Sequence, residues 1–288
     1  MPQSFVNQAL ARCSVTGSRL WFNCNPAGDK THWFYQEWIE QAKEKRALYL
    51  HFTMRDNPSL SEEVLDRYER MYSGLFYDRY ILGEWCVAEG LVFPYFEPDK
   101  DRWIASTGNE PYSKITVGID FGETGSLTTM CCCGIKGHFE AIDVLREGVQ
   151  ERTDALDTET IANKCADFLN ECRVMFGRYD YVFYDAASPA LGNRVAAILR
   201  ERGLPWRNVA PCVKTPLEGR PVTVDGMLCQ NRLRITPQAQ GLIRALSSLR
   251  WDEKTPNVPE DKNIGNINDF WDSFNYAFSA WQEYFDRR

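Results

Sequence analysis

Apolar and polar residues alternate in the stretch ITVGIDFGETGSLTTMCCCG, which covers residues 115–134. In its first half, branched apolar side chains at every second position alternate with Thr116, Gly118 and Asp120. A period of two residues predicts a strand with one buried face. This strand ends in a carboxylate, and a turn bracketed by glycines follows at once over 122–125.

The same kind of pattern continues toward the end of the chain. An apolar strand over 181–184 again ends in a carboxylate, Asp185, and Pro189 opens a helix. Because a hairpin stands beside strands that alternate with helices, we predict an α/β fold with a mixed sheet and helices on both faces. The other predicted elements are hairpin strands over 127–134 and 138–146 with a turn at 135–137, helices over 158–176, 189–203 and 238–249, a strand over 209–213, a Pro/Gly-rich loop over 215–221 and a final helix from about Asn268.

The first third of the chain has a different pattern. Strands are predicted over 19–28 and 46–54 with a helix over 33–45 between them, followed by a helical stretch over 57–85. Ser61 is placed to cap that stretch, and Gly74 to interrupt it. The polar, turn-rich run 99–112 marks a boundary. We therefore divide the chain into residues 1–55, 56–112 and 113–288.

Composition excludes several classes of protein. With 44% hydrophobic and 13% aromatic residues among 288, the chain has enough apolar material for a packed core. No window approaches the roughly 18 apolar residues of a membrane span, and the N-terminus has no signal-peptide pattern. The spacing of the ten cysteines fits neither a disulfide scaffold nor a zinc site, which favours reduced thiols in a cytosolic protein.

The net charge of −7 argues against a dedicated DNA-binding module, which usually carries a basic surplus. Any contact with nucleic acid must then be local. Arg194, Arg200, Arg202 and Arg207 are the candidates for such a contact. A solvated helix face explains each of them equally well.

The two carboxylates at strand ends, Asp120 and Asp185, suggest a site, because neighbouring strand ends converge at one edge of a sheet. Two carboxylates held together raise each other's pKa unless a cation lies between them. Hard divalent cations prefer such oxygen ligands, Mg²⁺ first and Mn²⁺ as its substitute. Two such ions about 3.5–4 Å apart would stabilise the attacking and leaving oxygens of phosphodiester cleavage.

A third acid is available in the segment INDFWDSFNYAFSAW over 267–281. At about 100° per residue, Asp269, Asp272 and Tyr276 share one helix face, opposite an apolar stripe. Acids in that position are often only solvated, and the spacing Asp-x-x-Asp can also cap a helix. Likewise, Asp120 can be a turn residue and Asp185 an N-cap-like residue. Taken together, the acids predict metal-dependent phosphate chemistry without naming a substrate.

The order strand–Asp, hairpin, helix, strand–Asp, helix–Asp resembles the ribonuclease H-like fold. More specifically, nearly the whole chain resembles the large terminase subunit of tailed bacteriophages, the motor that packages DNA. The stretches that carry this resemblance are WFNCNPAGDKTHWFYQEWI with its Asn-Pro pair, RDNPSLSEEVLDRYERMYSGLFYDRYILGEWCVAEGLVFPYF, VGIDFG, FYDAASP and NDFWDSFNYAF. Each motif is loose, but their order and spacing together are specific.

The resemblance implies a function for each part of the chain. Residues 1–55 would be the end of a P-loop ATPase lobe, 56–112 a helical linker and 113–288 a nuclease that cuts double-stranded DNA concatemers. Asp120 would bridge two Mg²⁺ or Mn²⁺ ions, Asp185 and Asp272 would each bind one ion, and Asp269, which stands where a His is common, would assist. The implied partners are a small terminase subunit and the portal protein, in the host cytoplasm and away from membranes.

The sequence departs from this family in one respect. No Walker A loop of the form G-x-x-x-x-G-K-[ST] occurs in it. We therefore expect no complete ATP site in this chain.

The sequence leaves two alternatives open. IDFGETGS also resembles the phosphate-binding opening of the actin and sugar-kinase ATPases, in which Thr124 and Ser126 would help to cradle phosphate. A non-catalytic docking remnant of the packaging motor is the other.

Overall fold

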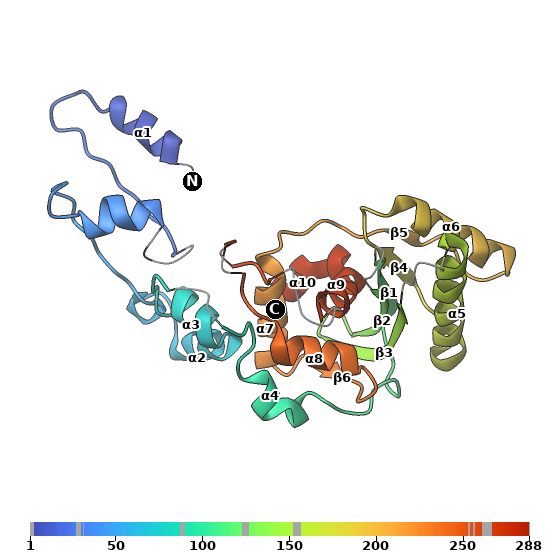
Figure 1. Ribbon diagram of the computed structural model, residues 1–288. Coiled ribbons are helices and arrows are strands. Elements are labelled where there is room, and N and C mark those ends of the chain that lie inside the picture. Colours follow the sequence, from blue (N-terminus) through green and yellow to red (C-terminus); the bar gives the residue numbers. More distant parts are fainter. Residues whose placement is uncertain are drawn as a thin grey trace. The chain divides into compact units, whose positions relative to one another are not determined.

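The structure is a computed structural model, and it describes residues 3–26, 30, 32–86, 90–122, 127–151, 157–252, 254–255, 257–260 and 267–287. Its contacts divide the chain into two compact units, Met1–Ala88 and Glu89–Arg288 (Figure 1). The division into residues 1–55, 56–112 and 113–288 stays a prediction. Among the described residues, no helix has both the length and the apolar character needed to cross a membrane.

The second unit is built on a six-stranded mixed sheet. The strand order is β5-β4-β1-β2-β3-β6. β1 pairs antiparallel with β2 and parallel with β4, while β4 and β5 are parallel, as are β3 and β6. The strands are β1 (Lys114–Asp120), β2 (Leu127–Lys136), β3 (Ala141–Glu151), β4 (Tyr181–Tyr184), β5 (Val209–Pro211) and β6 (Leu233–Ile235). The mixed sheet agrees with the prediction.

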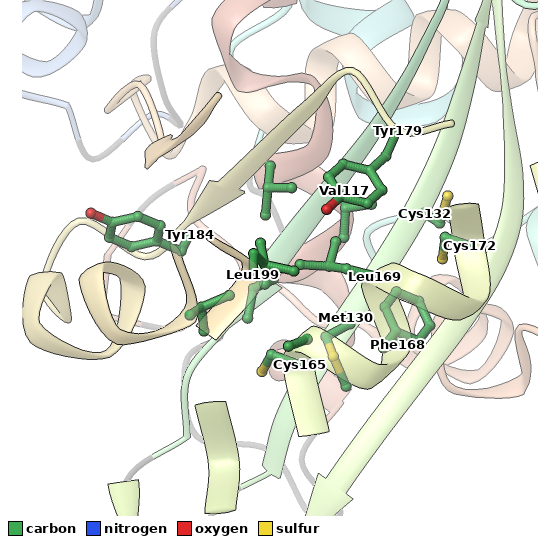
Figure 2. Packing of buried hydrophobic residues seen from close by; sticks show 14 of the residues in the cluster. Val117, Met130, Cys132, Cys165, Phe168, Leu169, Cys172, Tyr179, Tyr184 and Leu199 are labelled. Atoms are coloured by element: carbon green, nitrogen blue, oxygen red, sulfur yellow. The ribbon is translucent and has the colours of Figure 1, made fainter. Parts of the chain in front are cut away.

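One face of the sheet packs against helices α5 (Thr158–Phe176) and α6 (Pro189–Glu201) (Figures 1 and 2). The core on this face includes Val117 from β1, Cys132 from β2 and Leu169 from α5 (Figure 2). α5 has the predicted bounds, because Asp157 caps its first turn and Gly177 ends it in the left-handed region with φ of 80°.

Helix α9 (Ile267–Phe278) packs against the other face, over β1, β2 and β4. The close approach depends on Gly118. A Cβ atom at that position would lie 1.9 Å from the Ser273 carbonyl oxygen and 2.5 Å from the Ala277 nitrogen. The sheet is therefore covered on both faces, as predicted.

The hairpin differs in its bounds from the prediction. β2 continues to Lys136 and the turn covers 137–140, two residues later than expected. Gly137 takes a φ of 52° and Phe139 a φ of 63°, so the chain reverses through two left-handed residues. A break in register at Cys132 and Cys133 adds one residue to β3.

Three predicted elements of the second unit need correction. The segment 215–221 is not simply a loop, because α7 (Gly219–Cys229) starts inside it. β6 has no counterpart in the prediction, because a three-residue strand carries little periodicity. The predicted strand 209–213 ends at Pro211, and the predicted helix 238–249 corresponds to α8 (Gln240–Ser248). The chain ends in the short helices η4 (Ser279–Trp281) and α10 (Gln282–Asp286).

Residues 90–104 belong to the second unit by their contacts. Phe93 and Phe96 are fully buried, and the Val92 amide donates to the Leu249 carbonyl at 2.8 Å. The Trp103 indole donates to the Leu228 carbonyl at 2.9 Å. This segment includes α4 (Phe96–Asp99) and η3 (Lys100–Arg102).

In the first unit, the predicted strands over 19–28 and 46–54 are wrong. Within the described residues of these ranges the chain is extended or irregular without strand pairing, and Trp21 and Leu48 are 82% and 80% exposed. Apolar alternation forms a strand only when a neighbouring strand accepts its backbone hydrogen bonds. The described part of this unit supplies no such neighbour.

The helices of the first unit are closer to expectation. Ser61 caps α2 (Glu62–Met71) through a hydrogen bond from the Val64 amide, as predicted. The expected interruption lies at residues 72–73, and Gly74 begins α3 (Gly74–Tyr80). The expected helix 33–45 is reduced to residues 33–34 and a π-helical turn, η1 (Tyr35–Glu40). The remaining helices are α1 (Gln3–Ala11) and η2 (Met54–Asp56).

Candidate active site

Asp120 and Asp185 lie at the carboxyl ends of neighbouring parallel strands. Ile119 pairs with Tyr184 in the register, so the two aspartates occupy the next pair of positions. The Asp185 amide donates to the Ile119 carbonyl at 3.1 Å. Parallel strands bring their ends to one edge, and adjacent strands are about 4.8 Å apart. The sheet itself therefore fixes the two residues side by side.

The loop after Asp185 holds that carboxylate in place. Its Oδ1 accepts a hydrogen bond from the Ala187 amide at 3.0 Å, and its carbonyl accepts one from the Ser188 amide at 3.0 Å. Pro189 then starts α6 at the first helical position, where the missing N–H costs nothing. The turn therefore positions Asp185 before the helix begins.

Asp269 is anchored to the start of β2. Its Oδ2 accepts from the Leu127 amide at 3.1 Å, while its carbonyl accepts from Thr129 Oγ1 at 2.6 Å. Thr129 is the register partner of Asp120. The first turn of α9 thus lies over the same edge of the sheet that carries the two strand-end acids.

Asp272 forms an ion pair that links α9 to α7. Its Oδ1 accepts from Arg220 Nη1 at 2.8 Å. The Arg220 side chain is only 9% exposed, and its guanidinium lies 5.5 Å from the centre of the Tyr276 ring. A cation is therefore buried among the acids, at the start of a helix that has no counterpart in the prediction.

The pKa of Asp120 reflects this environment. Burial, followed by the charges of Asp272, Asp269 and Asp185, raises it from 3.8 to about 9, while Arg220 opposes the rise. The pKa of the Tyr276 phenol is also raised, first by burial and then by Asp272, Asp120 and Asp185. The structure thus brings the other three predicted acids close enough to Asp120 to repel its charge.

The chemistry of this group of side chains fits a hard divalent cation. Its donors are carboxylate oxygens, and a bound cation would relieve the repulsion that raises the pKa of Asp120. Within the part of the chain that the structure describes, no three acidic, His or Cys side chains are already arranged to hold a metal ion. In this arrangement Arg220 occupies one oxygen of Asp272.

Arg220 is the residue of this site that sequence reasoning missed. It stands in a segment that the pattern predicts as a Pro/Gly-rich loop, and the spacing of acids gives no information about a cation on another element. The local signal is weak, because Arg220 is a single charge between Gly219 and Pro221. Only the packing of α7 against the end of the chain shows that this charge is buried.

The candidate DNA-contacting arginines separate into two groups. Arg194 pairs with Glu159 and Glu201, and Arg202 pairs with Asp167, as expected for a solvated helix face. Arg200 and Arg207 instead lie 5.8 Å and 5.9 Å from the centre of the Trp206 ring.

Two other expectations concern the cysteines and the turn over 122–125. All ten cysteines lie in the described part of the chain, and each is a free thiol there. The turn 122–125, with Thr124 and Ser126 of the phosphate-binding alternative, lies mostly outside the described residues.

Comparison with known proteins places the chain in a family. A family model described as "Phage terminase large subunit" matches residues 6–82. Two crystal forms of the large terminase from a thermophilic bacteriophage match with a TM-score of 0.75, at 33% and 34% identity. They cover 96% and 98% of this chain, which spans 65% and 67% of theirs. No curated protein matches the sequence.

A more distant structure agrees on the fold. The P22 large terminase nuclease domain aligns with a TM-score of 0.50 at 9% identity, covering 66% of this chain and 92% of that domain. The six-stranded mixed sheet and this alignment show that the second unit has the mixed α/β fold of a terminase nuclease domain. With the matches over nearly its full length, the chain belongs to the phage large terminase family.

Proposed function

We propose that this chain is a divalent-metal-dependent endonuclease that cuts double-stranded DNA concatemers during phage genome packaging. The observation that supports this function best is the group of four carboxylates at one sheet edge. Three of them raise the pKa of Asp120. A protein maintains such repulsion at a cost in stability, and strongly perturbed carboxylates are typical of functional sites.

The proposed metal ligands are Asp120, Asp185 and Asp272, with Asp269 as an auxiliary residue. Asp120 would contribute to holding both Mg²⁺ or Mn²⁺ ions, because the charges of the other three acids all act on it. Bound ions would supply a polarised phosphate and a water molecule of lowered pKa. The chain itself would therefore not need to supply a Ser, Cys or His nucleophile.

The chain's own residues have distinct tasks in this proposal. β1 and β4 hold Asp120 and Asp185 on a rigid sheet, which favours accurate geometry. Asp269 fixes the start of α9 through its bonds to Leu127 and Thr129. Arg220 pairs with the side chain of Asp272 and places a positive charge beside the proposed metal ligands.

The proposal extends to partners only by family resemblance. Double-stranded DNA is the substrate, and a small terminase subunit and the portal protein would direct the cutting site, because the chain shows no base-reading helix motif. The thermophilic phage protein has been crystallised with ATP-γ-S and with ADP. We propose no ATP hydrolysis for these 288 residues, which contain no Walker A loop.

The test is Mn²⁺-dependent nicking of a supercoiled plasmid. We expect Asp120→Ala and Asp272→Ala to lower the rate by at least about 10³-fold, because each removes a ligand of the ions. Asp269→Ala should cost about 10–100-fold, as for residues that orient a ligand. Asp167→Ala, which removes an exposed acid of α5, is the matched control and should nick normally.

Two further measurements make the test decisive. Calorimetric titration with Mn²⁺ should show binding to the parent chain and weakened binding to Asp120→Ala. Thermal melting should show that Asp120→Ala remains folded. Nicking that persists in a folded Asp120→Ala variant would rule out this site.

A further inference from the structure

A second candidate site lies at the amino ends of the strands, opposite the carboxyl ends that carry Asp120 and Asp185. A cavity of about 740 Å³ is formed at the amino ends of β1, β4 and β5, together with the end of α5. Its lining includes Lys114, Arg173, Tyr181, Trp206 and Arg207. Because Lys114 begins the strand that Asp120 ends, the two sites are separated by about 20 Å of extended chain.

The cations of this cavity are not neutralised by acids. Among the described residues, Lys114, Arg173 and Arg207 form no ion pair. Asp180, which also lines the cavity, is paired with Arg178 at 3.1 Å and accepts from the Ile115 amide at 2.7 Å. In a chain with a net charge of −7, three cations that lack acidic partners around one cavity indicate an anionic ligand.

Aromatic rings lie beside two of these cations, Lys114 and Arg207. Lys114 lies over the rings of Phe139 and Trp281, at 5.9 Å from each. The Trp206 ring is 38% exposed, and the guanidinium groups of Arg200 and Arg207 lie 5.8 Å and 5.9 Å from its centre. Stacking on an aromatic ring restricts the arginine rotamers, so less entropy is lost when a phosphate binds.

An edge strand connects this cavity with the acids. β5 is at the edge of the sheet, with Arg207 two residues before it and Cys212 directly after it. The Cys212 amide donates to the carbonyl of Tyr184, the residue before Asp185, at 2.7 Å. Arg207 lies in the turn that leads into β5. The extended chain from Lys114 to Asp120 spans about 20 Å, which equals about six base pairs of duplex at about 3.4 Å each.

We propose that the cavity around Lys114, Arg173, Trp206 and Arg207 binds the phosphate backbone of the substrate DNA, about five to six base pairs from the cut. The duplex then lies along β5, with its scissile phosphate at Asp120 and Asp185. The identity of the ligand as substrate DNA rests on the proposed nuclease function. The cavity itself is independent of the catalytic acids, because none of them lines it.

Binding is measured by fluorescence anisotropy of a labelled 20-base-pair duplex, with EDTA present so that no cleavage occurs. We expect Lys114→Glu, Arg173→Glu and Arg207→Glu each to weaken binding at least about fivefold at low salt. Each should also lower the slope of log K against log salt by about one. Lys164→Glu carries the same change of charge on the exposed face of α5 and should bind like the parent chain.

Several outcomes would overturn the proposal. Unchanged DNA affinity in all three variants would overturn it. A loss of DNA affinity in Lys164→Glu as large as in the three variants would also overturn it. An acidic peptide, polyglutamate of matched charge, is the competitor for a protein partner at this cavity. If it binds more tightly than the duplex, the occupant is an acidic protein segment and the DNA proposal is wrong.

The experiment also separates this proposal from the nuclease function. If the parent chain binds DNA through these cations but never nicks plasmid with Mn²⁺, the nuclease proposal fails and the binding site stands. If it nicks plasmid and the three reversals leave both affinity and nicking unchanged, only the binding site fails.

Discussion

Arg220 donates to Asp272 at 2.8 Å, although the two residues are 52 positions apart on different helices. The ion pair places a fixed cation in the region where divalent ions are proposed to bind. Because the side chain of Arg220 is nearly buried, its charge is poorly screened by solvent. Arg220 and a metal ion therefore both lower the repulsion among the same carboxylates.

Replacing Arg220 tests this relationship. Arg220→Gln leaves Asp272 without its guanidinium, and we expect the metal-free protein to lose about 2 kcal/mol of stability at about pH 8. For a unit of this size that equals a fall in Tm of about 4–8 °C. Thermal melting with and without MnCl₂ measures the effect, and the metal should recover most of the loss by replacing the cation.

The control is Arg287→Gln, which breaks an exposed pair with Glu283 and should cost less than about 1 kcal/mol. An equal fall in Tm for Arg220→Gln with and without Mn²⁺ would show that Arg220 supports packing and does not compensate the carboxylates.

The stability of the metal-free protein should depend on the protonation of Asp120. Its pKa is about 9 when folded and 3.8 ordinarily, so between these values the folded state binds more protons than the unfolded state. Stability is therefore expected to fall as pH rises from about 4 to about 9. Asp120→Asn removes this dependence. At about pH 8, its Tm should exceed that of the parent by about 2–4 °C for each kcal/mol of stability that the substitution regains.

Melting curves of both proteins in EDTA, at about pH 5 and about pH 8, measure this difference. The advantage of Asp120→Asn should shrink at the lower pH, because there the pH is closer to the unfolded pKa of 3.8 and protonating Asp120 on folding costs less free energy. A constant difference at both values would assign the gain to packing and exclude the charge of Asp120 as its cause.

Gly118 is predicted to control the distance between β1 and α9. Gly118→Ala puts a Cβ atom 1.9 Å from the Ser273 carbonyl oxygen, so the helix must move. We expect a loss of about 3 kcal/mol, as for overpacked cores. Because Asp269 and Asp272 move with the helix, plasmid nicking should also fall by about 10²-fold.

Gly177→Ala separates this effect from the general cost of replacing a glycine. Gly177 has a φ of 80° with nothing near its Cβ position, so the change should cost about 1 kcal/mol and leave nicking intact. Normal nicking in Gly118→Ala would show that the approach of α9 does not determine the site.

Local pattern was sufficient for the elements whose stability comes from their own residues. β4 and α5 have the predicted bounds, because one is a short apolar run before an acid and the other has both caps in its sequence. The juxtaposition of Asp120 with Asp185 followed from the parallel pairing of β1 and β4. These features depend on periodicity and strand direction, which a sequence encodes directly.

Other features depend on partners that a local pattern does not reveal. The expected strands over 19–28 and 46–54 have the right apolar residues but no neighbouring strand among the described ones. α7 begins among prolines, and tertiary contacts such as the Arg220–Asp272 pair and the Thr223–Gln282 hydrogen bond hold it. The meeting of a cation with an acid from a distant helix is likewise set by packing alone.

The burial of residues 90–104 has a practical consequence for dissecting this chain. A fragment that starts at residue 113 keeps all four acids but removes Phe93, Phe96 and Trp103 from the hydrophobic interior they fill. The Leu228 carbonyl also loses its indole donor. Such a fragment would present bare apolar surface to water and would be expected to self-associate. A soluble fragment that carries the four acids should instead begin ahead of residue 90.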